Sequence, residues 1–396
     1  MSEGLDFEAL LADEDLRRRE FPVAGRVIYL AHAAVGPLPA RVAAAIAGYA
    51  ARAAETGQFE HLHKPAEDSA RSLAAAMLGA SADEIAFVPS TSAGLSLVAA
   101  GLPWRDGDSV VIAEGDFPAN VYPWLGLERR GVRVRRIPKN TGGLITKLDV
   151  LSALDERTRL VSLSSVHFST GAAIDVDAIG ALLHERGVLF CVDAIQSLGA
   201  LPMSARHVDF LAADAHKWLL GPQGIGVLFV RRERFSELYP ALLGWKSVRA
   251  DRDYGRAELE LKDDARRYEP GNLNALGLVG LAEALSILQA VGVPRIAERL
   301  RHLRSILVRG LLDRNFCICV CAAGTADGGE IDAHPMGITS FYDPAEDMAA
   351  LHKRLLAEGI VVSLRADPTG RFVIRVAPHF YSTEAEIQAL LKALRR

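Results

Sequence analysis

Between residues 81 and 230, short runs of β-forming residues alternate with stretches whose apolar residues recur at helical spacing. The expected strands cover residues 84–88, 109–113, 132–137, 160–164, 188–192, 210–213 and 226–230. The expected helices between them cover residues 93–100, 119–130, 150–155 and 176–186. This alternation predicts an α/β domain on a mainly parallel sheet, here of seven strands. The last run follows a short Gly/Pro-rich loop, which makes it a candidate for an antiparallel strand.

The C-terminal part of the chain follows a less regular pattern. Expected helices cover residues 274–291, 294–312, 345–358 and a final segment from residue 383. Expected strands cover residues 316–322, 337–341, 360–364 and 372–376. Strands and helices interspersed in this way predict a smaller α+β domain. We therefore expect a large domain over residues 20–290 and a small domain over residues 291–396, with the N-terminal segment 1–19 packed against the small one.

Charge and composition bear on partners and compartment. The 396-residue chain has a formal net charge of -4, so we expect no basic face for nucleic acid. Its apolar runs are far shorter than the roughly 20 residues that a membrane helix needs, so we expect no membrane contact. The first 20 residues are acidic and then arginine-rich, without the apolar centre of a secretory signal. Together with only four cysteines, these features predict a cytoplasmic protein.

Three of the cysteines, Cys317, Cys319 and Cys321, form a cluster. Their spacing of two residues predicts buried thiols on one face of a strand. No CxxC pattern or nearby histidine pair supports zinc, so we expect no metal site. His61 and His63 lie in a polar segment that is typical of a solvated helix or loop.

Two apolar runs end in residues that can carry chemistry. Asp193 ends the run 188–192, and Lys217 follows the run 210–213. The carboxyl ends of parallel strands face the crevice where ligands bind, so both side chains are expected in one pocket. Burial lowers the pKa of a lysine and suits it to Schiff-base chemistry. A site for pyridoxal 5′-phosphate (PLP) requires such a lysine, and a carboxylate that keeps the pyridine nitrogen protonated.

A phosphate site for this cofactor is expected upstream. Ser90, Thr91 and Ser92 follow the strand 84–88 and open the helix 93–100. Hydroxyl groups and backbone amides at a helix N-terminus bind anions well. The same three residues also suit an ordinary helix cap, and both interpretations stay open.

With these residues in place, the chain resembles the fold-type I PLP-dependent enzymes of aminotransferase class V. That family includes cysteine desulfurases, selenocysteine lyases, kynureninases and isopenicillin-N-epimerase-like proteins. The resemblance runs from residue 27 to the C-terminus, and its most specific part is the spacing of Asp193, Gln196, His216 and Lys217. It implies that Lys217 holds the cofactor as a Schiff base and that Asp193 pairs with the ring nitrogen. Gln196 would donate to the ring hydroxyl oxygen, and His216 would bind phosphate.

The same resemblance assigns roles to five further residues. Phe117 would stack on the PLP ring, His167 would stand near the ring hydroxyl, and His32 would approach the substrate. Arg375 would bind the substrate carboxylate through its guanidinium fork, and Asn272 would reach the phosphate site of a dimer partner. Simpler interpretations remain open: Phe117 as a core residue, His167 as a loop histidine, and Arg375 as a strand residue facing solvent.

The sequence departs from the family pattern at two places. Asp214 stands where several relatives carry a serine that contacts phosphate, so we expect its carboxylate to turn toward backbone or His216. Cysteine desulfurases carry a nucleophilic cysteine shortly before the carboxylate-binding arginine, but the segment 364–371 contains none. A persulfide relay through such a cysteine is therefore not expected.

These observations favour a PLP-dependent C–S lyase that acts on a cysteine-like amino acid by β-elimination, with Lys217 taking the α-proton. We expect a homodimer with its active site at the subunit interface. A class V aminotransferase and an isopenicillin-N-epimerase-like epimerase are the alternatives. A non-catalytic PLP-binding or regulatory subunit is an alternative of another class, although such a scaffold has no chemical need for Lys217. A nucleotide site is disfavoured, because neither GxGxxG after the first strand nor GxxxxGK[ST] occurs.

Overall fold

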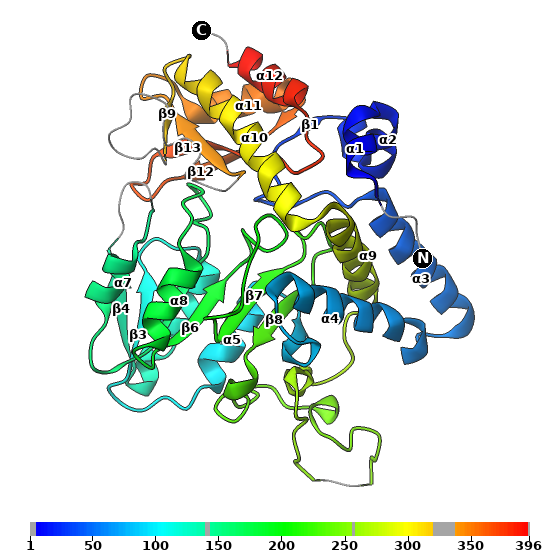
Figure 1. The fold of residues 1–396 in the computed structure, drawn as a ribbon, viewed down its shortest axis with the longest axis vertical. Helices are drawn as coiled ribbons and strands as arrows, with labels where there is room; N and C mark the ends of the chain where they lie inside the picture. The colour runs from blue at the N-terminus through cyan, green and yellow to red at the C-terminus, as the bar shows by residue number, and fades with distance from the viewer. Residues whose placement is uncertain (1–4, 139–142, 256–257, 320–336, 395–396) are drawn as a thin grey trace.

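The computed structural model describes residues 5–138, 143–255, 258–319 and 337–394, and a seven-stranded sheet forms its centre (Figure 1). In spatial order the strands are β2 (Ile85–Val88), β8 (Gly226–Val230), β7 (Phe210–Asp214), β6 (Leu189–Asp193), β5 (Thr158–Ser164), β3 (Ser109–Ala113) and β4 (Arg133–Ile137). Adjacent strands from β7 to β4 pair in parallel, whereas β8 is antiparallel to both β2 and β7. The predicted mainly parallel sheet is confirmed, and so is its antiparallel strand.

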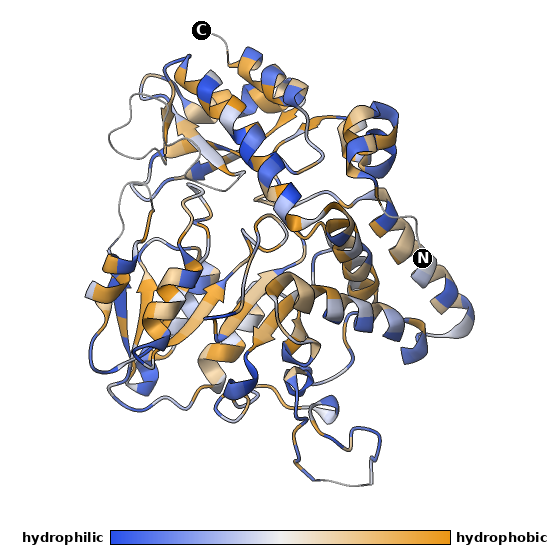
Figure 2. Cartoon of the chain, viewed as in Figure 1, coloured by the Kyte–Doolittle hydropathy of each residue, from blue (hydrophilic) through white to orange (hydrophobic). Residues whose placement is uncertain are grey.

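Both faces of this sheet are covered, which explains why its strands are apolar along most of their length. Alternate residues of a strand enter different cores: Val161 packs into one buried cluster and Leu160 into the other. In Figure 2 most of these strands are correspondingly orange. The helices of this part are α3 (Ala40–Thr56), α4 (Lys64–Leu78), α5 (Thr91–Gly101), α7 (Lys147–Ala153), α8 (Val176–His184) and α9 (Ala275–Val291).

A second, four-stranded antiparallel sheet lies toward the C-terminus. In spatial order its strands are β12 (Ser363–Ala366), β13 (Phe372–Val376), β10 (Thr339–Tyr342) and β9 (Cys317–Ile318). A third buried cluster joins it to the helices α10 (Val293–Leu312), α11 (Met348–Ala357) and α12 (Glu384–Ala393). The division into domains at residue 290 stays a prediction.

The N-terminal segment packs on the C-terminal part. The short helices α1 (Phe7–Ala12) and α2 (Glu14–Glu20) come first, and β1 (Ile28–Tyr29) pairs in parallel with β11 (Ile360–Val361). The buried Arg17 of α2 donates to Glu386 of α12 at 2.9 Å. Phe21 stacks on Tyr381 with ring centres 3.8 Å apart. Phe7 and Leu10 of α1 also belong to the buried cluster of the seven-stranded sheet, so the assignment of the N-terminal segment to the small domain stays a prediction.

Two expected elements are broken in the structure. The helix expected over 119–130 is replaced by a 3-10 turn at Pro118–Asn120, the one-turn helix α6 (Tyr122–Leu125) and a second 3-10 turn at Glu128–Arg130. Proline lacks an N–H group, so Pro118 and Pro123 cannot donate to a preceding turn. The strand expected over 360–364 divides into β11 and β12, because the two pieces pair with different strands.

The expectation of fully buried cysteines is wrong for Cys317 and Cys319, which are half-buried. The described part of their strand, β9, lies at the edge of the four-stranded sheet, where one side has no neighbouring strand. Cys321 lies outside the described residues. Within the described ranges, no three His, Cys, Asp or Glu side chains are grouped so as to hold a metal ion.

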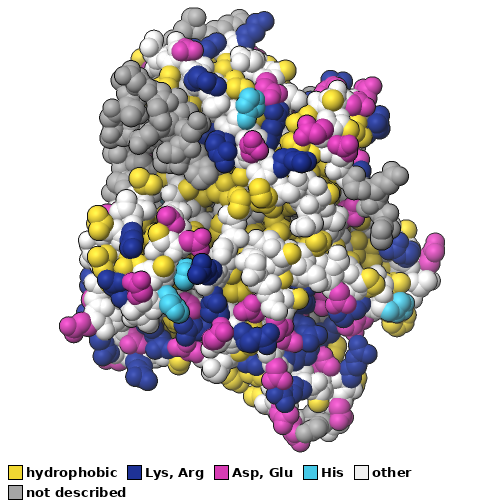
Figure 3. Space-filling view, in the orientation of Figure 1, with side chains coloured by type: hydrophobic (Ala, Val, Ile, Leu, Met, Phe, Trp, Pro, Cys, Tyr) yellow, Lys and Arg dark blue, Asp and Glu magenta, His cyan; other side chains and the backbone are white. Residues whose placement is uncertain are grey.

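In the part of the chain that the structure describes, no single helix is long and apolar enough to cross a bilayer. Among the described helices, α9 and α10 taken together have the length and composition of a span, but they are bent by 75° relative to each other. Basic and acidic side chains are interspersed over the face shown in Figure 3. This face therefore offers a polyanion no continuous basic surface.

Candidate active site

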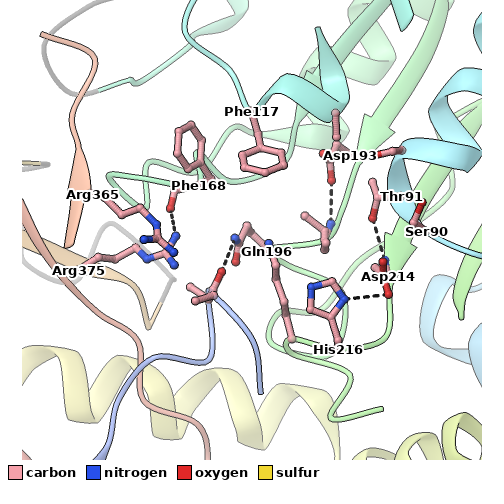
Figure 4. A pocket seen from close by; sticks show the side chains of 16 residues that line it. Ser90, Thr91, Phe117, Phe168, Asp193, Gln196, Asp214, His216, Arg365 and Arg375 are labelled. Atoms are coloured by element: carbon pink, nitrogen blue, oxygen red, sulfur yellow. Dashed lines mark hydrogen bonds and ion pairs between the residues drawn. The ribbon is translucent and has the colours of Figure 1, made fainter. Parts of the chain in front are cut away.

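A cavity of about 260 Å³ opens at the edge of the seven-stranded sheet where the parallel strands end (Figure 4). The predicted site residues that line it are Ser90, Thr91, Ser92, Phe117, Asp193, Gln196, His216, Lys217 and Arg375. Asp214, Phe168 and Arg365 line it as well. The structure thus brings together residues that lie far apart in the chain. His32, His167 and Asn272 do not line the cavity.

Lys217 is buried in the turn that follows β7, and its Nζ atom lies 5.7 Å from the centre of the Phe117 ring. Burial lowers the pKa of Lys217 to about 8; the charge of Asp193 opposes this shift and that of Arg375 adds to it. A lysine with this pKa is partly neutral near pH 7, and the neutral amine is the form that attacks a carbonyl carbon.

The turn that carries Lys217 is tightly constrained. Leu220 adopts a left-handed conformation with φ of 57°, which is uncommon for a residue other than glycine. Its backbone N–H donates to the carbonyl of Lys217 at 3.2 Å. On the other side, Gly36 donates to the carbonyl of His216 at 2.6 Å, and a Cβ atom at Gly36 would lie 2.8 Å from the Lys217 carbonyl oxygen. Only glycine allows this close approach.

Asp193 ends β6 and is almost completely buried. Its Oδ1 atom accepts a hydrogen bond from the backbone of Ile195 at 3.0 Å. Burial raises the pKa of Asp193 to about 7, and the negative charge of Asp116 adds to the shift. A buried carboxylate in this state is stabilised by a cationic partner, such as a protonated ring nitrogen.

Gln196 is buried and lines the cavity. Its Oε1 atom accepts from the indole of Trp218 at 2.9 Å, and its Nε2 atom donates to the carbonyl of Ala33 at 2.9 Å. An amide nitrogen carries two N–H groups, so Nε2 retains one for a ligand.

The opposite end of the cavity from the arginines suits an anion. Ser90 caps α5 by accepting from the backbone of Ala93 at 3.2 Å, and Thr91 accepts from the backbone of Asp214 at 2.9 Å. Cap and anion site therefore coexist here, since the hydroxyl hydrogens and the N-terminal amides remain available. The carboxylate of Asp214 lies 2.9 Å from Nδ1 of His216, at ion-pair distance but out of line for a hydrogen bond. This agrees with the expectation that Asp214 turns toward His216.

Two arginines form the other end of the cavity. Arg375 on β13 and Arg365 on β12 both point toward Phe168 in Figure 4. Arg375 is 2% exposed, so the interpretation as a solvent-facing strand residue is wrong. Its Nη1 atom donates to the Phe168 carbonyl, whereas Nε and Nη2 have no hydrogen-bond partner among the described residues. Burial and then the charge of Arg365 lower the pKa of Arg375 to about 9. Buried N–H donors without partners are stabilised by an anionic ligand such as a carboxylate.

The remaining predicted residues lie outside the lining of the cavity. His32 is fully buried, and its two ring nitrogens contact the carbonyl of Ala377 at 3.1 Å and the hydroxyl of Tyr381 at 2.8 Å. Burial, and then the nearby His379, hold the pKa of His32 well below its ordinary value. Both nitrogens of His32 are therefore used within the protein.

His167 and Asn272 also contact other parts of the molecule or solvent. The ring of His167 lies 3.0 Å from the Thr170 hydroxyl and 3.3 Å from the Gly115 carbonyl. Asn272 is exposed. Sequence reasoning missed Arg365 and the buried Asp116; the period of two within the segment 363–375 was the only available signal for Arg365.

Comparisons with known proteins agree with this geometry. The family model described as aminotransferase class-V matches residues 28–390. The probable cysteine desulfurase of Methanothermobacter thermautotrophicus is 32% identical over 410 residues, which cover 96% of this chain and 97% of that protein. A cysteine desulfurase of Klebsiella pneumoniae is 33% identical over 309 residues, which cover 71% and 73% of the two chains.

Solved structures show the same fold. The apo cysteine desulfurase of Thermococcus onnurineus NA1 has a TM-score of 0.85 at 25% identity, over 96% of this chain and 97% of that chain. The cystine C–S lyase C-DES, in complex with its reaction product cysteine persulfide, has a TM-score of 0.84 at 24% identity, over 94% and 98% of the chains. The chain belongs to the aminotransferase class-V family, and it is a PLP-dependent enzyme with the fold-type I architecture.

The residues of the cavity fit this cofactor. A buried carboxylate, a lysine with a lowered pKa and a helix N-terminus line one cavity, and these are the groups that a pyridine nitrogen, an aldehyde carbon and a phosphate require. At the same cavity, Nε and Nη2 of Arg375 have no hydrogen-bond partner among the described residues.

Proposed function

We propose that this enzyme is a C–S lyase that eliminates sulfur from a cysteine-type amino acid without passing it to a cysteine of its own chain. The observation that carries the proposal is the polarity of the cavity. Asp193, Lys217, Arg365 and Arg375 all line it, and the charges of Asp193, Arg375 and Arg365 all act on Lys217. A cavity with these groups supports an amino acid whose carboxylate is held by the arginines while Lys217 takes the α-proton.

Bound PLP supplies a carbonyl group for the substrate amine and a ring that accepts the electron pair of Cα. Asp193 would hold the ring nitrogen, Gln196 the ring hydroxyl, and Phe117 one face of the ring. The hydroxyls of Ser90, Thr91 and Ser92, with His216, would hold the phosphate. Lys217 would hold the cofactor at rest.

In the elimination, the Nζ atom of Lys217 takes the α-proton, and the Cβ–S bond breaks with its electron pair leaving on sulfur. Arg375 binds the α-carboxylate and keeps the Cα–H bond turned toward Lys217. Arg365 beside it supports a substrate with a second carboxylate, such as cystine. Among the described residues that line the cavity, none is a cysteine. Cys191 lies inside the sheet, where burial raises the pKa of its thiol, so it supports no sulfur transfer.

The proposal includes a homodimer in the cytoplasm. A run of large apolar side chains is exposed between residues 239 and 259: Tyr239, Leu242, Leu243, Trp245, Tyr254 and Leu259. Exposed apolar surface of this extent supports an interface. The exposed Asn272 follows it in the chain and would complete the phosphate site of the partner subunit.

The products decide between the hypotheses. Purified enzyme with PLP is incubated with cystine and with cysteine, and pyruvate, alanine and D-amino acids are measured. Pyruvate and ammonia support the lyase. Alanine together with protein-bound sulfur indicates a desulfurase, the activity for which the relatives are named. Keto acid formed only with an acceptor indicates a transaminase, and D-isomers indicate an epimerase. Lys217→Ala should bind PLP without the visible absorbance of the lysine adduct, whereas Lys64→Ala, at a half-exposed lysine that does not line the cavity, should keep it. Wild-type enzyme without this absorbance would overturn the proposal.

A further inference from the structure

A buried carboxylate, Asp116, lies next to the cavity but does not line it. It accepts hydrogen bonds from the backbone N–H of Phe117 at 2.7 Å and from Nδ2 of Asn120 at 3.0 Å. The Ser164 hydroxyl lies 2.7 Å and 2.9 Å from its two oxygens, and the Ser164 backbone N–H lies 3.3 Å away. Asp116 therefore ties the turn after β3 to the end of β5.

The same turn is fixed by a second set of buried hydrogen bonds. Oδ1 of Asn120 accepts from the hydroxyl of Ser162 at 2.6 Å and from the indole of Trp124 at 3.1 Å. Asn120, Ser162 and Trp124 are completely buried. Loss of the Asp116 carboxylate would leave donors of this network without a partner, which is costly in a buried site. The position of Phe117 consequently depends on Asp116.

Two features of the cavity meet at this network. The Phe117 ring lines the cavity and contacts the Phe168 ring edge to face, with centres 5.3 Å apart. Ser164 is the register partner of Asp193 on the neighbouring strand. Asp116 thus contacts the backbone of Phe117 and the strand next to Asp193, and its negative charge helps to raise the pKa of Asp193.

We propose that Asp116 is a positioning residue for the cofactor, which fixes Phe117 over the PLP ring and places a second negative charge behind Asp193. The inference rests on the proposed roles of Phe117 and Asp193. A second anion near the ring nitrogen favours its protonated form, because opposite charges in a buried site stabilise each other. Asp116 touches neither the cofactor nor the substrate.

The test compares Asp116→Asn with wild type as apo-proteins titrated with PLP. The dissociation constant is read from absorbance, and the circular dichroism of the bound cofactor reports the orientation of its ring. Asp116→Asn should raise the dissociation constant about tenfold, the effect of one lost charge-assisted hydrogen bond. The circular dichroism should weaken, and kcat should fall while KM for the amino acid stays nearly unchanged.

Asp209→Asn is the matched control. Asp209 is a buried carboxylate that accepts from the Phe190 backbone and from Arg234, both at 2.8 Å, just before the start of β7 and away from the cavity. A merely structural role would lower the unfolding midpoint in both variants alike and leave PLP binding unchanged in both. We expect Asp209→Asn to lower the midpoint only.

Wild-type affinity and circular dichroism in Asp116→Asn would overturn the inference. If that variant does not fold, Ser164→Ala decides, since it keeps the carboxylate but removes the hydroxyl that joins it to β5. A weaker PLP affinity in Ser164→Ala is expected, and an unchanged one would refute the role. Failure of wild type to bind PLP at Lys217 would instead refute the proposed function, so the two failures are distinguishable.

Discussion

Arg375 donates from its Nη1 atom to the carbonyl oxygen of Phe168, which joins β13 of the four-stranded sheet to the loop after β5 of the seven-stranded sheet. Ser169 beside it donates to the carbonyl of Ala366 at 2.6 Å and so adds a second link. The cationic end of the cavity is therefore built from both sheets. Substitutions at the arginines should alter substrate kinetics, and a substitution at Asp193 should alter the stability of the apo-protein.

The two arginines should differ in their effect on substrate choice. Arg375→Ala should lower kcat/KM about a hundredfold, mainly through KM, because a charge-assisted pair contributes about 2–3 kcal/mol. Arg365→Ala should lower kcat/KM for cystine more than for cysteine, since only cystine has a second carboxylate. Steady-state kinetics with both substrates check this, with Arg371→Ala, outside the cavity, as control. Equal losses for the two substrates in Arg365→Ala would contradict a second carboxylate site.

The stability of the apo-protein should depend on pH through Asp193. Its pKa is raised from 3.8 to about 7, so between these values the folded protein holds a proton that the unfolded chain has released. The stabilisation from this group is complete below about pH 4 and is lost as pH rises through 7. Relative to Asp193→Asn, wild type should lose on the order of 2–4 kcal/mol across this window. Urea unfolding at several pH values measures the difference, and parallel pH profiles would argue against it.

The buried side chain of Arg375 should destabilise the apo-protein. Because two of its buried donor atoms have no partner in the described part of the chain, Arg375→Met should raise the free energy of unfolding by about 1–2 kcal/mol, although it weakens substrate binding as Arg375→Ala does. Arg71 is equally buried but pairs with Glu67 and Glu269 at 2.9 and 2.8 Å. Arg71→Met should therefore destabilise by about 3 kcal/mol. If both variants lost a similar free energy of unfolding, the unpartnered donor atoms of Arg375 would not be destabilising the apo-protein.

Turnover of cystine should not need any cysteine of the chain. A variant with Cys191→Ala and with Cys317, Cys319 and Cys321 changed to serine should keep kcat/KM within about twofold, as expected for sites away from the reacting atoms. Pyruvate release measures the activity, and mass spectrometry of wild type during turnover looks for a persulfide. A large loss of activity together with a persulfide on one of these thiols would restore the relay mechanism.

The fold and the cofactor end of the site were predictable because their signals are local. Alternating apolar runs and strand ends place Asp193 and Lys217 from a few neighbouring residues each. Arg365 was missed because its position in the cavity depends on the pairing of β12 with β13, which the period of two along one strand does not specify. Asp116 was missed for a similar reason, since its partner Ser164 is 48 residues away.

His32 illustrates the same limit. The family resemblance implied that it approaches the substrate; in the structure its ring contacts Ala377 and Tyr381, which are 345 and 349 residues away in the chain. Burial of a histidine between two such partners follows from tertiary packing alone. The helix expected at 119–130 was wrong for a local reason. Its apolar residues have helical spacing, but Pro118 just before this range and Pro123 inside it interrupt a continuous helix.

The antiparallel strand β8 has a consequence for how the site assembles. It returns directly from the Lys217 turn and pairs with β7, so this part of the pocket forms through contacts that are close in sequence. Ser90 and Arg375 lie far from Lys217 along the chain, one before it and one after it, and closing such long loops is slow. The pocket should therefore be completed late in folding. During refolding, cofactor absorbance should return after secondary structure, so PLP uptake would report the end of folding rather than its nucleation.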